Sequence, residues 1–120
     1  MLLLVPFVDT MTTMLNEKLP LTPAEWELWG NPIESKEYFE YIYSYSPYNN
    51  LDNKSYPSML ITTSLFDNRV LYSEPVKYIA RLQDKKTDNS TNNKWVAVLF
   101  DKNSPTQRFL PCVTKEDFII

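Results

Sequence analysis

The uninterrupted run Met59–Leu65, which reads Met-Leu-Ile-Thr-Thr-Ser-Leu, constrains the fold of this 120-residue chain more than any other segment. Apolar and β-branched residues bounded by a turn-forming pair, here Asp67-Asn68, are typical of a strand buried on both faces of a parallel sheet. Ser73-Glu-Pro75 then begins a helix that we expect to reach about Lys86, and residues 95–100 form the next apolar strand candidate. This order of strand, helix and strand predicts a βαβ unit and an α/β fold.

The first half of the chain predicts two helices and one more strand. The apolar run 2–8 is consistent with the end of a buried strand. Residues 22–29 predict a helix in which Thr22 is the N-cap and Gly30 lies just past the end. A second helix is expected over 35–45, where aromatic and apolar residues recur at helical spacing.

Two or three parallel strands do not complete a stable sheet. A parallel strand that is buried on both faces needs neighbours on both sides and helices above and below it. Unpaired edges, in contrast, invite association with other chains. The pattern therefore predicts part of a larger α/β domain.

Histidine is absent from the sequence, and glycine occurs once, at Gly30. Without histidine, the 120 residues cannot assemble a Cys₂His₂ zinc site, a His₂-carboxylate iron site or a self-contained Ser-His-Asp hydrolase. One glycine likewise excludes the G-x-S-x-G elbow, the G-x-G-x-x-G fingerprint and the P-loop. We expect no metal ion and no cofactor.

The charge balance argues against a nucleic-acid partner, and the N-terminal segment argues against a membrane-spanning one. Twelve basic and fifteen acidic residues give a net charge of −3, with no basic run that would neutralise many phosphates. The apolar start, 1–8, lacks a basic region and a cleavage site, and it is too short to span a bilayer. A single cysteine, Cys112, leaves no intrachain disulfide, which favours a cytoplasmic location.

Asp67 is the first candidate for a functional group. In open α/β sheets, functional groups gather in the loops outside the carboxyl ends of the strands, and Asp67 follows the predicted strand 59–65. A carboxylate at this place could orient an imidazole in an acyl-transfer triad. Alternatively, it could simply form an Asx-turn with its own backbone. Arg69 nearby could bind a substrate carbonyl or pair with a surface acid.

Glu25 and Glu27 form the second candidate, a pair of carboxylates beside two tryptophans. Paired acids can bind a guanidinium through two hydrogen bonds, which would select a basic substrate side chain. Thr22-x-x-Glu25 also fits a capping box, in which Glu25 returns to the N-cap amide. Moreover, residues i and i+2 of a regular helix do not face each other, so the sequence favours capping.

Six strings in one order resemble the C-terminal part of the catalytic domain of the prolyl oligopeptidase family of serine peptidases, most closely its oligopeptidase B branch. The similarity covers roughly residues 4 to 89. The strings are Val5-Pro-Phe-Val-Asp9, Pro20 to Pro32, Tyr41 to Tyr48, Tyr56 to Thr63, Asp67-Asn-Arg-Val70 and Glu74-Pro75.

This resemblance implies an α/β-hydrolase catalytic domain, capped in the family by a β-propeller, that cleaves peptides; the oligopeptidase B branch prefers to cleave after arginine or lysine. Asp67 matches the triad acid of the family's Asp-x-Arg-Val motif, and Arg69 matches the arginine that holds a substrate backbone carbonyl. Glu25 and Glu27 match the acidic pair that receives the basic P1 side chain. The implied fold is a partial α/β-hydrolase over residues 1–93.

The sequence also departs from the family pattern. The family's nucleophilic serine lies upstream of the matched part, and its triad histidine has no counterpart, because after Lys94 no match is evident. Residues 94–120 are expected to form a divergent tail, with one strand and then irregular structure. Ser64 replaces a glycine of the family, so we expect the backbone that leads to Asp67 to differ in form.

We therefore expect a fragment of a serine oligopeptidase that is inactive alone. A non-catalytic binding or regulatory protein is the alternative; it would pair its sheet edges with a partner or with a complementing polypeptide that supplies serine and histidine. A chain that does not fold and has no function is the third possibility.

Overall fold

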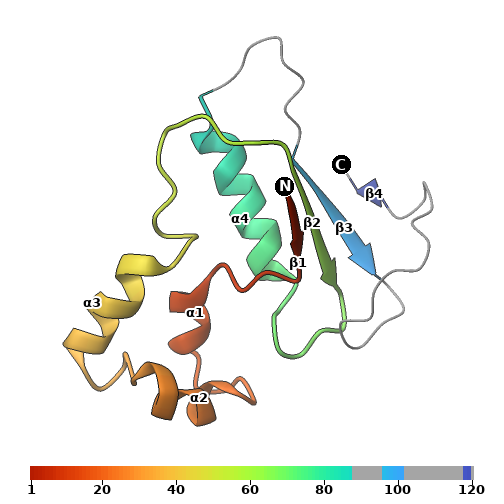
Figure 1. Cartoon of the computed structure of the whole chain (residues 1–120). Helices are drawn as coiled ribbons and strands as arrows, with labels where there is room; N and C mark the ends of the chain where they lie inside the picture. Colours follow the sequence, from red (N-terminus) through yellow and green to blue (C-terminus); the bar gives the residue numbers. More distant parts are fainter. Residues whose placement is uncertain (88–95, 102–117, 120) are drawn as a thin grey trace. The chain divides into compact units, whose positions relative to one another are not determined.

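The computed structural model describes residues 1–87, 96–101 and 118–119 (Figure 1). These residues fall into two compact units. The sheet unit comprises Met1–Phe7 and the chain from Asp52 onward. The helical unit comprises Val8–Leu51.

The sheet unit contains four strands in the order β1-β2-β3-β4: β1 (Leu2–Leu4), β2 (Met59–Ser64), β3 (Val96–Asp101) and β4 (Phe118–Ile119). The first three run parallel, and β4 pairs antiparallel with β3. The predicted strands 59–65 and 95–100 are thus confirmed to within one residue at each end. Much of the predicted tail 94–120 lies outside the described residues, and its divergence stays a prediction.

Helix α4 (Ser73–Lys85) joins β2 to β3 and lies along one face of the sheet (Figure 1), which confirms the predicted βαβ unit. Its first turn contains Pro75, whose fixed φ suits a helix start. Tyr78, Ile79 and Leu82 recur at helical spacing and are buried. The helix is therefore held to its unit by one apolar stripe.

Burial in β2 differs between its two faces. Met59, Ile61 and Thr63 are at most 3% exposed, whereas Leu60 and Thr62 are half-buried. The expectation of a strand fully buried on both faces is thus wrong for the second face. The described part of this unit supplies a single helix, and one helix does not cover two faces.

Strand β1 is an edge strand, and it corrects the expectation of a buried strand end. Leu2 and Leu4 are 57% and 54% exposed. The strand ends after three residues, although the amide of Val5 still donates to the Thr62 carbonyl oxygen at 3.0 Å. The apolar run predicts a strand correctly, but Leu2 and Leu4 lie on the same face as the half-buried Leu60 and Thr62, and their burial requires cover on that face.

The helical unit packs three helices: α1 (Thr10–Met14), α2 (Thr22–Trp29) and α3 (Lys36–Tyr45). The predicted helices over 22–29 and 35–45 are confirmed. Their core is formed by the buried side chains of Met11, Met14 and Ile42, against which Trp26 and Trp29 pack.

Gly30 ends α2 with a φ of +88°, a conformation that residues with a Cβ rarely adopt. A Cβ at this position would also lie 2.3 Å from the ring of Tyr38. The single glycine of the chain is therefore required both by the turn and by the packing of this ring.

Thr22 is not the N-cap of α2, which corrects the predicted capping box. The N-cap is Leu21, and no side-chain hydrogen bond caps the helix. Instead, the Thr22 hydroxyl donates to the carbonyl oxygen of Thr13 at 3.0 Å. The hydroxyl that the sequence assigns to the helix cap thus forms a tertiary hydrogen bond, which links α2 to the end of α1.

Candidate functional site

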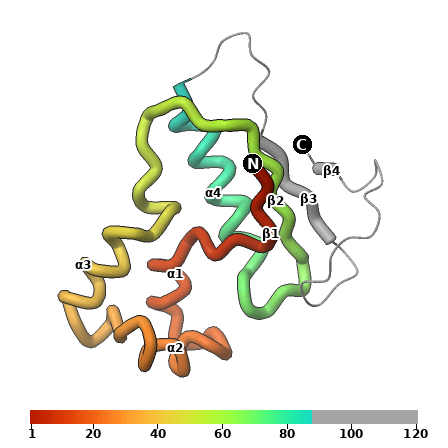
Figure 2. The backbone as a smooth tube through the Cα atoms, viewed as in Figure 1, coloured from red at the N-terminus to blue at the C-terminus, as the bar shows by residue number. Residues whose placement is uncertain are grey.

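Asp67 lies in the turn that follows β2 and leads into α4; Figure 2 traces the backbone through this turn. Its side chain is 5% exposed. The amides of Arg69 and Val70 donate to Oδ1 at 2.8 and 3.0 Å. The sequence alternative of an Asx-turn is therefore present in the structure.

An Asx-turn does not exclude a further role for this carboxylate. Within the described residues, both hydrogen bonds to the Asp67 carboxylate end on Oδ1. Two bonds to one oxygen fix the plane of the carboxylate and leave Oδ2 as the acceptor for a partner. The turn can therefore aim the carboxylate as well as fold the chain.

Ser64 stands where the family resemblance implies a glycine, and the structure shows how the serine is used. Its side chain is buried, and its Oγ accepts a long hydrogen bond of 3.4 Å from the amide of Phe66. The Ser64 carbonyl oxygen accepts from the Asp67 amide, also at 3.4 Å. Ser64 therefore contributes to the same turn as Asp67.

Arg69 follows within the same turn, and its side chain is exposed. Its backbone amide orients Asp67, whereas its guanidinium is accessible to a ligand. In the described part of the chain, no acid forms a salt bridge with Arg69, so the alternative of a surface ion pair finds no support there.

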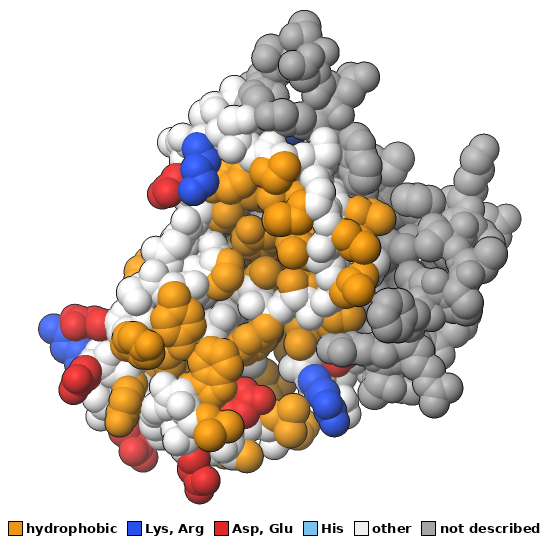
Figure 3. Space-filling view, in the orientation of Figure 1, with side chains coloured by type: hydrophobic (Ala, Val, Ile, Leu, Met, Phe, Trp, Pro, Cys, Tyr) orange, Lys and Arg blue, Asp and Glu red, His pale blue; other side chains and the backbone are white. Residues whose placement is uncertain are grey.

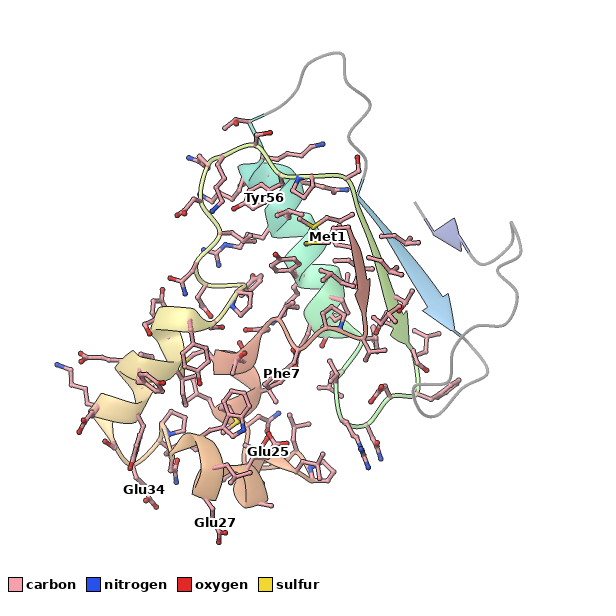
Figure 4. All side chains as sticks on the ribbon, viewed as in Figure 1. Met1, Phe7, Glu25, Glu27, Glu34 and Tyr56 are labelled. Carbon is pink, nitrogen blue, oxygen red and sulfur yellow. The ribbon has the colours of Figure 1, made fainter. Side chains whose placement is uncertain are left out.

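Glu25 and Glu27 lie on α2 in the helical unit. Glu25 is half-buried and Glu27 is exposed. Figure 4 shows the two side chains leaving α2 in different directions, as expected for positions i and i+2 of a regular helix. The structure does not bring the two carboxylates together on one side of α2.

Two buried carboxylates escaped the sequence analysis as candidates. Asp9 is 0% exposed and precedes α1, and Glu74 is 3% exposed in the first turn of α4. Burial of a charge is costly unless hydrogen bonds or a helix N-terminus compensate for it. The signal available in the sequence was the place of each acid at a predicted helix start or strand end, since composition alone does not indicate burial.

No group of three or more acidic, cysteine or histidine side chains that could hold a metal ion occurs among the described residues. None of the described helices has the length and hydrophobicity that a bilayer-spanning segment needs.

Comparison with known proteins identifies a family to which this chain is similar. A family model described as the prolyl oligopeptidase family matches residues 1–103. The match extends through β3, farther than the range 4–89 over which the sequence motifs resemble the family. The end of β3 is thus part of the family pattern.

Two curated bacterial proteins are similar in sequence. Protease 2 of Moraxella lacunata is 55% identical over 87 residues, and dipeptidyl aminopeptidase BI of Pseudoxanthomonas mexicana is 56% identical over 86 residues. Each match takes in 72% of this chain but 12% of the relative. The chain thus spans about one eighth of the length of these relatives.

Solved structures agree with the sequence relatives. Oligopeptidase B from Leishmania major matches with a TM-score of 0.76 at 42% identity, over 86% of this chain and 14% of that chain. Oligopeptidase B from Trypanosoma brucei, solved with covalently bound antipain, matches with the same TM-score of 0.76 at 44% identity, with the same coverage. The described fold is therefore that of a segment of these α/β-hydrolase peptidases.

Proposed function

Because this chain belongs to the prolyl oligopeptidase family, we propose that it supplies the acid of a Ser-His-Asp triad to an oligopeptidase B-like peptidase. The proposal rests on one observation above all: the buried carboxylate of Asp67 follows a parallel strand and is held by the amides of Arg69 and Val70. The carboxyl ends of parallel strands are where α/β enzymes place reacting groups.

In this role Asp67 accepts a hydrogen bond from the Nδ1–H of an imidazole through its Oδ2 atom. The acid holds the tautomer and orientation of the histidine and stabilises the imidazolium that forms when serine is deprotonated. It does not itself take the proton. The Asx-turn supports this role because it fixes one oxygen and spares the other.

The serine and the histidine come, in this proposal, from another part of a peptidase. The 120 residues contain no histidine, so they hold no general base of this kind. A complementing polypeptide would pair with the edge strand β1, whose exposed Leu2 and Leu4 support such a contact. The isolated chain is expected not to hydrolyse peptides.

The proposed substrate is a peptide with arginine or lysine at P1. Glu25 is the acid that would contact the basic side chain, because it is half-buried and its charge is less screened than that of exposed Glu27. Glu27 would contribute through its charge at longer range. Arg69 would donate to a backbone carbonyl of the substrate, which its exposed guanidinium supports.

A chimeric peptidase tests the role of Asp67. The matched segment of Protease 2 from Moraxella lacunata is replaced by the corresponding residues of this chain, and cleavage after arginine in a short peptide is measured. Asp67→Asn is expected to lower kcat on the order of 10⁴-fold, the effect of losing a triad acid with the geometry intact. Asp84→Asn, an exposed acid of α4, is the control and should leave kcat unchanged.

Glu25→Gln in the same chimera is expected to raise KM for the arginine peptide about 10- to 100-fold, since a hydrogen bond to a charged group contributes roughly 1.5–3 kcal/mol. Glu27→Gln should have a smaller effect.

The two predictions are independent. A folded chimera that cleaves equally well with Asp67→Asn would contradict the proposed triad role, whatever the result at Glu25.

A further inference from the structure

Helix α3 exposes an unusual number of aromatic side chains. Among its ten residues, only Ile42 is buried. Exposure ranges from 36% to 64% in the set Tyr38, Phe39, Tyr41, Tyr43 and Tyr45. Figure 3 shows hydrophobic side chains gathered on the surface in the region that α3 occupies in Figure 1, with acidic groups at the rim. Contiguous exposed apolar surface of this kind usually marks an interaction site.

The exposed side chains form two separate aromatic pairs. Tyr41 and Tyr45 meet edge to face, with ring centroids 5.3 Å apart and an interplanar angle of 74°. Tyr45 also lies 6.3 Å from Trp29 of α2. Phe39 and Tyr43 stack at 6.1 Å. The Tyr41 ring is the most exposed of these, at 64%.

A carboxylate continues the first pair along the helix. Glu37, Tyr41 and Tyr45 occupy positions i, i+4 and i+8, so they share one side of α3. Within the described residues, Glu37 forms no ion pair, whereas Glu40 is paired with Lys36 at 3.4 Å. Glu37 therefore leaves an uncompensated negative charge one turn from an exposed ring.

The charge of the helical unit adds to this local charge. Residues 8–51 contain seven acidic and two basic side chains, although the whole chain has a net charge of only −3. Tyrosine is neutral at physiological pH, and burial together with the neighbouring Tyr41 raises the pKa of Tyr45 further from that range. The surface thus combines neutral aromatic rings with excess negative charge, which is complementary to a cation.

We propose that this side of α3, defined by Glu37, Tyr41 and Tyr45, binds a cationic peptide segment. An arginine side chain would lie over the Tyr41 ring while its guanidinium pairs with Glu37. Guanidinium groups suit such a place, because they stack on aromatic faces and bind carboxylates through two hydrogen bonds. This surface is distinct from Asp67 and from the acids of α2, and the proposal does not depend on a catalytic role for either.

Nuclear magnetic resonance titration of the full chain tests the proposal. The probe is the peptide acetyl-Gly-Arg-Gly-Arg-Gly-amide, and the matched probe replaces both arginines with citrulline, which has a similar shape and no charge. The arginine peptide is expected to shift the amide signals of α3 in a saturable way that weakens as salt is added, because the contacts are exposed. The citrulline peptide should shift them far less.

Two variants on the proposed face and one control locate the contact. Glu37→Gln and Tyr41→Leu are each expected to weaken binding about two- to fivefold, as for exposed ion pairs and cation–π contacts. Tyr41→Phe keeps the ring and should bind as the parent chain does. Tyr43→Leu removes an exposed ring, at 44%, from the other aromatic pair and is expected to leave affinity unchanged.

Three results would overturn the proposal: no shifts in α3 with the arginine peptide, equal binding of the citrulline peptide, or unchanged affinity in folded Glu37→Gln. The double variant Glu25→Gln/Glu27→Gln separates this surface from the proposed P1 acids. Retained α3 shifts in that variant support the proposal. Their loss would assign the binding to α2, which contradicts this inference and leaves the proposed role of Asp67 untouched.

Discussion

The sheet unit and the helical unit position their candidate residues by different means. Asp67 is held by main-chain amides in a turn that follows a strand, so its orientation depends on the backbone path. Glu25 projects from a helix that is fixed by side chains: the Trp26 indole donates to the Met14 carbonyl oxygen at 3.0 Å, and the Thr22 hydroxyl to that of Thr13.

The two means of support imply different tolerance to substitution. A turn built from backbone amides accepts many side chains around its acid, provided that the acid itself is kept. A helix held by an indole and a hydroxyl depends on those particular groups. We therefore expect the geometry of Asp67 to be robust to neighbouring substitutions and that of Glu25 to be sensitive to them.

The largest expected effect comes from removing the core side chain of either unit. Ile61 in β2 and Ile42 in α3 are both 0% exposed. Truncation of each to alanine should lower the free energy of unfolding by about 2–5 kcal/mol, from lost burial and the cavity left behind. Chemical denaturation followed by tryptophan fluorescence and by amide hydrogen exchange measures both losses.

Two of the three tryptophans, Trp26 and Trp29, lie in the helical unit, so tryptophan fluorescence mainly reports that unit. Exchange protection at β2 reports the sheet unit. A loss below about 1 kcal/mol for Ile61→Ala would contradict the described burial of β2.

A smaller effect is expected at the turn after α2. Gly30→Ala places a Cβ in a backbone conformation with φ of +88° and 2.3 Å from the Tyr38 ring. The expected loss is about 1–3 kcal/mol, as for strained positive-φ positions. The paired variant Gly30→Ala/Tyr38→Ala removes the ring. It should recover only the part of the lost stability that comes from the clash between the new Cβ and the ring, and not the part that comes from the positive φ. An unchanged melting temperature for Gly30→Ala would show that α2 ends differently.

The smallest effect distinguishes the observed start of α2 from the capping box. Glu25→Ala should change the free energy of unfolding by no more than about 0.5 kcal/mol, because this side chain is not part of a cap. Thr22→Val, which removes the hydroxyl bound to Thr13, should cost about 0.5–1.5 kcal/mol. A larger loss of stability for Glu25→Ala than for Thr22→Val would contradict this account and support a capping box.

The sequence predicts the elements of both units well, because periodicity is a local property. The helix over 22–29 is found with its predicted bounds, and the strand predicted over 59–65 ends one residue earlier. Prediction from the sequence fails where a tertiary contact redirects a side chain, as at Thr22. Burial is also missed: Leu2 and Leu4 pair with Leu60 and Thr62 on the face of the sheet that no described helix covers, which a local pattern does not reveal.

The candidate site shows the same division. The place of Asp67 after β2 follows from the strand pattern, and the Asx-turn is one of the two alternatives that the sequence leaves open. The divergence of Glu25 and Glu27 follows from helical geometry and is seen in Figure 4. The roles of these acids and of Arg69 in a reaction stay predictions that rest on the family resemblance.

The acylation rate of the chimeric peptidase tests the role of Asp67 most directly. Rapid mixing with a chromogenic arginine ester separates formation of the acyl-enzyme from its hydrolysis. With Asp67→Asn, the acylation step is expected to slow by about four orders of magnitude while the affinity for the ester is kept, since the acid orients the histidine and does not contact the ester. An acylation rate that stays within threefold of the parent chimera would contradict the assignment of Asp67 as the triad acid.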